Sequence, residues 1–144
     1  MVLTWFGCGR SPKAPGTVGS LGALPLGIIL LLVGGPLLLL ICAAGLFVVG
    51  WKFADLELPG ADSDPSWIVA DEVVGQWIAL AAAPLTFFGI AASFGLFRAF
   101  DIIKPWPVGW ADRNVGGGLG VMLDDVLAGV YAAVILLVAR AFWA

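Results

Sequence analysis

The longest uncharged stretch of this sequence runs from residue 14 to residue 51 and limits what the chain can fold into. As one straight helix it would be about 57 Å long at about 1.5 Å per residue. That is roughly twice the thickness of the hydrocarbon core of a bilayer. The stretch must therefore fold back, and Gly34-Gly35-Pro36 is its strongest turn signal. We expect one helix at about 19–33 and a second at about 37–54.

A second uncharged run covers residues 73–97 and allows two interpretations. It could form one tilted span with a kink at Pro84, or a hairpin that turns there. We favour the hairpin, because a single helix reaching residue 103 would again be longer than the bilayer is thick. The remaining helices are then expected at about 66–82, 86–103 and 121–142.

The composition supports a membrane protein. Hydrophobic residues make up 61% of the 144 residues, and the mean hydropathy is +1.05. Both values are typical of a chain that crosses a bilayer several times. We predict an all-α polytopic membrane protein, with residues 1–144 forming a single domain of about five short transmembrane helices. The small net charge of -3 gives no indication of a nucleic-acid partner.

Five such helices would sort the charged residues between the two faces of the membrane. The face that holds the N-terminal loop would carry six of the seven basic residues and all ten acidic ones, and only Arg140 would lie on the other. The positive-inside rule makes the charged face cytoplasmic and places the C-terminus outside. We therefore expect the functional surface on the cytoplasmic side.

The chain contains no histidine, which removes the usual general base, a phosphohistidine nucleophile and most zinc sites. Cys8 is expected in a loop and Cys42 within an apolar run, so a disulfide between them is not expected. Neither cysteine belongs to a C-x5-R phosphatase pattern. The chemistry must therefore come from other groups, of which the acidic side chains stand out.

Five carboxylates are expected near the cytoplasmic ends of three helices. Two follow the start of the third helix, one lies near the end of the fourth, and two begin the fifth; they are Asp71, Glu72, Asp101, Asp124 and Asp125. A hairpin at Pro84 would bring all three helix ends to the same membrane depth. Apolar helices rarely carry ionisable groups without a functional reason, so these residues are the candidate catalytic set.

Two glycines lie one helical turn deeper than these carboxylates. Gly75 follows Asp71 by four residues, and Gly129 follows Asp125 by four. Small residues let the backbones of membrane helices approach closely. We expect the two glycines to bring the acidic helix ends together.

Clustered carboxylates repel one another unless a cation or a proton is present. Hard oxygen ligands favour Mg²⁺, which keeps several waters and commonly bridges to phosphate. Arg98, Lys104 and Arg113 lie nearby in the sequence and suit phosphate oxygens. The combination predicts a metal-assisted reaction on a phosphorylated amphiphile, with a metal-activated water as the attacking group.

Structural roles stay open for some of these residues. Arg98 and Asp101, three residues apart, could form only an ion pair within one helix. The two aspartates of the last helix could be only N-terminal caps. The acidic pair of the third helix is harder to explain in this way, because a carboxylate inside a membrane segment costs roughly 2.5–3.5 kcal/mol on insertion scales.

Three segments resemble the motifs of the phosphatidylglycerophosphatase A family. They are GCGRSPKAPGTVGS at 7–20, IVADEVVGQWI at 68–78 and FRAFDIIKPWPVGWADRNVGGGLGVMLDDVLAG at 97–129. They occur in the family's order and at its spacing, and together they cover nearly the whole chain. The resemblance implies a Mg²⁺-dependent phosphatase of the bacterial inner membrane, which removes the terminal phosphate of phosphatidylglycerophosphate to give phosphatidylglycerol.

The resemblance and the residues together lead to one hypothesis for the site. The residues expected to hold Mg²⁺ are Asp71, Glu72, Asp101 and Asp125, and Asp124 is expected to support them or to act as the base. The residues expected to bind the phosphorylated headgroup are Arg98, Lys104, Asp112 and Arg113, together with a loop containing Thr17 and Ser20 that would close over it.

Two other functions are alternatives to this one. An ion-coupled transporter or channel could use the carboxylates as a relay, although their grouping at one interface argues against a path through the membrane. A CDP-alcohol phosphotransferase would also be membrane-bound and Mg²⁺-dependent, but its D-G-x2-A-R signature is missing here. No feature of the sequence indicates an oligomeric state.

Overall fold

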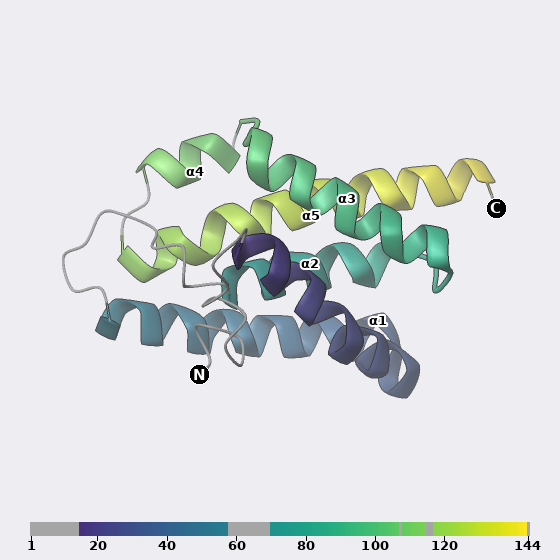
Figure 1. Ribbon diagram of the computed structural model, residues 1–144, viewed down its shortest axis with the longest axis horizontal. Coiled ribbons are helices and arrows are strands. Elements are labelled where there is room, and N and C mark those ends of the chain that lie inside the picture. Colours follow the sequence, from purple (N-terminus) through teal and green to yellow (C-terminus); the bar gives the residue numbers. More distant parts are fainter. Residues whose placement is uncertain (1–14, 58–69, 107, 115–116, 144) are drawn as a thin grey trace.

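The computed structural model describes residues 15–57, 70–106, 108–114 and 117–143, which form helices and include no strand. The helices are α1 (Pro15–Glu57), α2 (Ala70–Ala82), α3 (Phe87–Ile103), α4 (Val108–Asn114) and α5 (Gly117–Trp143). Figure 1 shows the four longer ones packed side by side, with α4 at one end. The predicted all-α class is confirmed.

Helix α1 is divided at Gly35, whose φ of 71° and ψ of -170° are not helical. Glycine reaches this conformation because it has no Cβ, and Pro36 suits the first turn of the segment that follows. The chain reverses at this point, from the purple arm to the blue arm in Figure 1. We call residues 15–34 the N-terminal arm and residues 36–57 the C-terminal arm. The predicted fold-back is confirmed.

The second hairpin turns at Pro84, between α2 and α3. The Ala83 amide donates to the Leu80 carbonyl at 3.1 Å, and the Thr86 amide donates to the Pro84 carbonyl at 2.8 Å. Thr86 then caps α3, because its hydroxyl accepts a hydrogen bond from the Gly89 amide at 3.0 Å. The hairpin is the interpretation that the structure supports, and the alternative of one kinked span is wrong.

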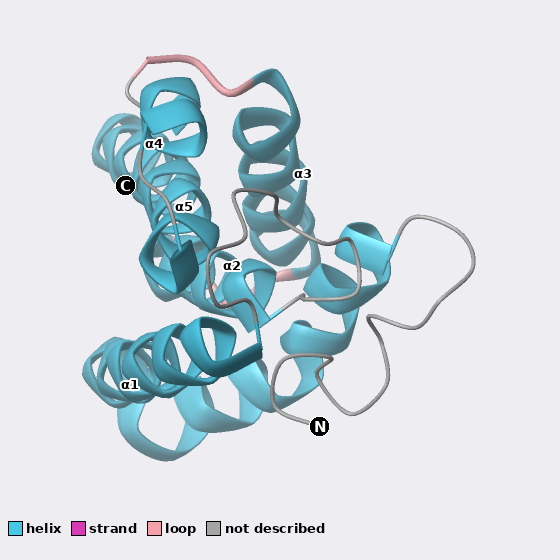
Figure 2. Cartoon of the chain, turned by 90° about the vertical axis from the view of Figure 1, so that its left-hand side faces the viewer, coloured by secondary structure: helices cyan, strands magenta, loops and turns pink. Residues whose placement is uncertain are grey.

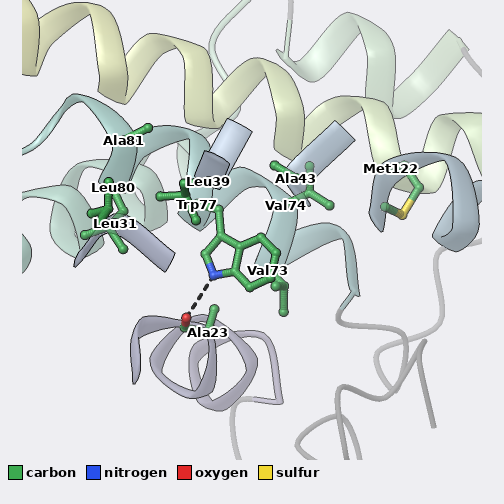
Figure 3. Packing of buried hydrophobic residues seen from close by; sticks show 10 residues of the cluster. All are labelled: Ala23, Leu31, Leu39, Ala43, Val73, Val74, Trp77, Leu80, Ala81 and Met122. Carbon is green, nitrogen blue, oxygen red and sulfur yellow. Dashed lines mark hydrogen bonds between the residues drawn. The ribbon is translucent and has the colours of Figure 1, made fainter. Parts of the chain in front are cut away.

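Helix α2 lies at the centre of the bundle, between the arms of α1 on one side and α3 and α5 on the other (Figure 2). Eleven of its 13 residues are buried, so its polar side chains are enclosed along with its apolar ones. Figure 3 shows Trp77 within the main apolar cluster, where its Nε1–H donates to the Ala23 carbonyl at 2.9 Å. This bond ties α2 to the N-terminal arm.

The outer surface is strongly apolar. Leu32, Val33 and Leu37 around the α1 turn are 72%, 76% and 71% exposed, which is typical of residues that face lipid. In the described part of the chain, two helices are long and apolar enough to cross a membrane, over Thr17–Phe53 and Met122–Phe142. The other two helices of the bundle, α2 and α3, have 13 and 17 residues.

The segment after α3 differs from the prediction, which placed no helix between residues 103 and 121. It contains the short helix α4, and α5 begins at Gly117, four residues earlier than expected. Helix α3 ends as predicted, before Pro105, with Lys104 in the left-handed region at φ 53°. The Lys104 amide donates to the Phe100 carbonyl at 2.9 Å, which closes the last turn.

Candidate active site

Five carboxylates from three helices meet at one end of the bundle. Asp71, Glu72 and Asp125 each offer an oxygen within 4.8 Å of the others, and so do Asp101, Asp124 and Asp125. Asp125 belongs to both groups and joins them. The structure therefore brings together the whole acidic set that the sequence singled out.

The close crossing of α2 and α5 makes this convergence possible. A Cβ on Gly75 would lie 2.5 Å from the Asp125 carbonyl oxygen, and a Cβ on Gly129 would overlap the Gly75 carbonyl oxygen. Real Cβ atoms do not come that close to a backbone, so both positions depend on glycine. The sequence prediction for this pair of glycines is confirmed.

Each acidic pair has the same local geometry. The Asp71 carboxylate accepts a hydrogen bond from the Glu72 amide at 2.9 Å, and the Asp124 carboxylate accepts one from the Asp125 amide at 2.9 Å. Asp71 and Glu72 lie in the first turn of α2, where the helix dipole favours negative charge. Asp124 and Asp125 lie two turns inside α5, so the alternative that they are N-terminal caps is wrong.

Two basic side chains partner two of the carboxylates. Lys104 Nζ lies 2.8 Å from Asp124 Oδ2, and the Arg98 guanidinium forms an ion pair with Asp101 within α3. The ion pair that was one structural alternative for Arg98 and Asp101 is thus present. Asp101 also contributes to the acidic cluster, so its pairing does not exclude a functional role.

Two buried carboxylate oxygens of the cluster have no hydrogen-bond partner among the described residues: Glu72 Oε2 and Asp125 Oδ2. Asp125 is 2% exposed, and Asp71 and Asp124 are each 1% exposed. Burying charged oxygens without a partner is costly, and neighbouring carboxylates add repulsion. A divalent cation would remove both penalties, and this set of hard oxygen donors fits Mg²⁺.

Thr17 and Ser20 lie in the first turns of α1, not in a loop as expected. The N-terminal arm runs parallel to α2, since Ala23 contacts Trp77 and a Cβ on Gly27 would lie 2.8 Å from Leu80. Ser20 precedes Ala23 by one turn and therefore lies closer to the acidic end of α2. Ser20 is fully buried and Thr17 is half-buried.

Helix α4 carries Asp112 and Arg113, whose side chains lie outside the described part of the structure. The helix begins close to the end of α3, because the Gly109 amide donates to the Pro105 carbonyl at 3.2 Å. The Tyr131 hydroxyl also donates to the Trp106 carbonyl, which fixes this connection against α5. Both contacts place α4 on the Lys104 side of the bundle.

A buried polar contact below the cluster was missed by sequence reasoning. Gln76 Nε2 donates to Ser93 Oγ at 3.3 Å, and Ser93 Oγ donates to the Ile90 carbonyl at 2.7 Å. This contact links α2 to α3 one turn below Glu72. A glutamine within an apolar segment was the available signal, because such side chains commonly bond across membrane helices.

The fold and the site define a class: an all-helical protein with long apolar helices and one buried acidic centre flanked by cations. Comparison with known proteins narrows the class to one family. A family model described as phosphatidylglycerophosphatase A matches residues 1–140. The chain belongs to the phosphatidylglycerophosphatase A family, which is a family of phosphatases, as the sequence motifs predicted.

Three relatives show the extent of the similarity. An Escherichia coli (strain K12) protein named Phosphatidylglycerophosphatase A is 40% identical over 94% of this chain and 80% of its own length. A Haemophilus influenzae protein of the same name is 44% identical over 99% of this chain and 88% of its own length. A Bacteroides thetaiotaomicron protein, named provisionally as a phosphatidylinositol-3-phosphatase, is 42% identical over 97% of this chain and 92% of its own length. No solved structure matches the chain.

Proposed function

We propose that this chain removes the terminal phosphate of phosphatidylglycerophosphate, giving phosphatidylglycerol and inorganic phosphate, with Mg²⁺ as the cofactor. The observation that carries the proposal is the meeting of five carboxylates from α2, α3 and α5, two of which have a buried oxygen with no hydrogen-bond partner in the described part of the chain. The family supplies the substrate, since two relatives are named for this activity. Neither a transporter nor a CDP-alcohol phosphotransferase gains support from these relatives.

The metal ligands in this proposal are Asp71, Glu72, Asp101 and Asp125. Bound Mg²⁺ would neutralise charge on the phosphoryl group and supply an activated water as the attacking group. Asp124 is better suited to support than to general-base catalysis, because its two oxygens already accept from Lys104 and from the Asp125 amide. It holds Lys104 in place beside the cluster.

The basic residues would bind the phosphomonoester. Arg98 has a buried Nε with no hydrogen-bond partner among the described residues, in addition to the nitrogen that contacts Asp101. An arginine offers five N–H donors, so its ion pair with Asp101 leaves further donors for phosphate oxygens. Lys104 at the C-terminal end of α3 and Arg113 of α4 would add positive charge, and Asp112 precedes Arg113 in α4. Thr17 and Ser20 would contact the headgroup from α1.

We place the site at the cytoplasmic face of a bacterial inner membrane, with about five short membrane-crossing segments. The two arms of α1 would count as two segments, followed by α2, α3 and α5. Arg140 supports this arrangement, because its guanidinium donates to the Ala82 carbonyl at 3.2 Å, at the end of α2 opposite the carboxylates. The basic residue assigned to the outer face thus lies at the other end of α2 from the acidic cluster that Arg98 and Lys104 contact.

Phosphate release from pure phosphatidylglycerophosphate by the purified chain in detergent micelles tests this proposal. Release should stop with EDTA and return with Mg²⁺. Asp125→Asn should lower turnover at least a hundredfold, whereas Asp55→Asn, the same change at an exposed position at the end of α1, should not. Phosphatidylinositol 3-phosphate, the substrate class in the name of the third relative, should be tested in parallel. Undiminished release in EDTA would reject the metal-dependent mechanism.

A further inference from the structure

An apolar groove of about 330 Å³ lies beside the acidic cluster. Its lining combines the C-terminal arm between Leu40 and Val48 with Val74 and Ile78 of α2 and Val126 of α5. Every lining side chain is apolar. Leu40 is 41% exposed and Val48 is 50% exposed, so the groove opens on the outer surface of the bundle.

The register of the helices places the groove directly below the carboxylates. Val74 follows Asp71 by three residues and Ile78 follows it by seven, so all three lie on one face of α2. Val126 is the residue after Asp125. The upper end of the groove is therefore formed by neighbours of two acidic residues that come from different helices.

The C-terminal arm extends the groove away from the site. A Cβ on Gly50 would lie 3.7 Å from Ala70 Cβ and 2.8 Å from Met122 Cε, so this part of the arm is level with the starts of α2 and α5. The arm runs antiparallel to α2, which places Val48 near the cluster and Leu40 about 12 Å further along, by the helical rise. The groove thus leads from the polar site into the apolar part of the bundle.

We propose that this groove holds part of one acyl chain of the phosphomonoester lipid substrate while the cluster engages its terminal phosphate. The inference rests on the proposed function and extends it, because it assigns lipid recognition to residues outside the acidic site. The glycerol-containing headgroup separates the terminal phosphate from the acyl chains. The acyl chain would therefore not pass through the acidic cluster, but would enter the groove from its exposed side, beside Val48. An apolar groove whose lining includes the neighbours of the proposed metal ligands is suited to a ligand with an apolar and a phosphorylated part.

A binding experiment tests this inference without turnover. The probes are phosphatidylglycerophosphate and phosphatidylcholine, each with a diazirine in the middle of one acyl chain, mixed at equal mole fraction with the full-length protein in micelles. After illumination, peptides containing Ala44 or Ile78 should carry at least fivefold more label from phosphatidylglycerophosphate. Equal labelling by both lipids would show a general lipid surface. Absence of label from these peptides would show that the acyl chain lies elsewhere. Either result overturns the proposal.

Kinetics with two substrates supply a second test. Ala44→Trp and Val48→Trp fill the groove from exposed positions, and Val49→Trp is the matched control, because Val49 is 41% exposed and lies outside the lining. The ratio of kcat/KM for a long-chain to a short-chain phosphatidylglycerophosphate should fall about tenfold in the groove variants, the effect of losing burial of roughly two methylene groups. It should not change in the control.

The two proposals fail in different ways. If both groove variants fold and keep the wild-type ratio of kcat/KM for long-chain to short-chain substrate, the proposal that the groove binds an acyl chain is overturned. If the wild-type protein released no phosphate from either substrate, the proposed function would fail. The labelling result would still decide whether the groove binds an acyl chain.

Discussion

Gly129 of α5 lies against Gly75 of α2 with almost no space between their backbones: a Cβ on Gly129 would come within 3.0 Å of the Gly75 Cα. A Cβ on Gly75 would also contact the Phe97 ring of α3. Three helices therefore meet at the level just below the carboxylates. The distances within the acidic cluster depend on this contact.

Substituting Gly129 should disturb both stability and the site. In Gly129→Ala the new methyl group must push α2 and α5 apart, which should lower the free energy of unfolding by about 1–3 kcal/mol and reduce Mg²⁺-dependent phosphate release. Gly95→Ala is the control, because a Cβ there would meet nothing within 4 Å. Denaturation by dodecyl sulfate in mixed micelles, followed by circular dichroism, measures the difference. Equal stability of the two variants would contradict the close-contact account.

Removing one charge from the cluster should change how the protein responds to metal. With Mg²⁺ at about 100 times its Kd, the wild type should gain about 2.7 kcal/mol of stability. Asp125→Asn should be more stable than the wild type in EDTA, because it relieves repulsion among buried carboxylates, and Mg²⁺ should stabilise it little. Thermal unfolding with and without Mg²⁺ measures both effects. A full Mg²⁺ response in this variant would remove Asp125 from the metal site.

Lys104 and Asp124 should behave as a coupled pair. Lys104→Asn keeps a residue that tolerates the left-handed conformation, but it removes the ammonium group that pairs with buried Asp124. The loss should be about 1–3 kcal/mol of stability, and adding Asp124→Asn should recover most of it, while phosphate release stays low in both variants. A double-mutant cycle on the free energy of unfolding tests the coupling. Additive losses would show that the two side chains do not stabilise each other.

Trp77 should contribute to stability through its hydrogen bond to the Ala23 carbonyl. Trp77→Phe keeps an aromatic ring but removes the donor, so the free energy of unfolding should fall by about 1 kcal/mol. Trp106→Phe is the matched control, because the Trp106 side chain is 76% exposed. Unfolding in mixed micelles compares the two variants. A larger loss for the exposed tryptophan would contradict this role of Trp77.

The proposed orientation predicts which positions are accessible from each side of the membrane. In a chain with Cys8 and Cys42 replaced by serine, Leu85→Cys should react with a membrane-impermeant maleimide in intact spheroplasts. Trp106→Cys should react only after permeabilisation, because it lies beside the acidic end. Both native side chains are exposed. The reverse pattern of labelling would invert the orientation.

Much of this fold was predictable from the sequence, because proline and glycine mark its turns and the helix lengths that a bilayer allows favoured a hairpin at Pro84. Gly35 and Pro36 lie in an apolar stretch too long to cross the membrane once, so a turn was expected there. Pro84 ends one helix, and Thr86 is a residue type that commonly caps the start of the next. The acidic cluster was predictable for the same reason: once both hairpins are set, the helix ends that carry the carboxylates lie at one end of the bundle.

The region between α3 and α5 was not predictable in the same way. Val108–Asn114 follows two prolines and contains a glycine, so its composition indicates a loop, and its helix depends on tertiary contacts such as Tyr131 with Trp106. The early start of α5 was hidden by consecutive glycines, which have low helix propensity in isolation. Local patterns do not report contacts of this kind.

The central claim is that carboxylates from three separate helices form one divalent-cation site, and Mn²⁺ binding tests it most directly. Electron paramagnetic resonance measures how much Mn²⁺ the purified chain removes from solution, without any substrate or turnover. We predict saturable binding by the wild type that Mg²⁺ displaces, weakened at least tenfold in each of Asp71→Asn, Asp101→Asn and Asp125→Asn, and retained in Asp55→Asn. Wild-type affinity in all three cluster variants would contradict the claim.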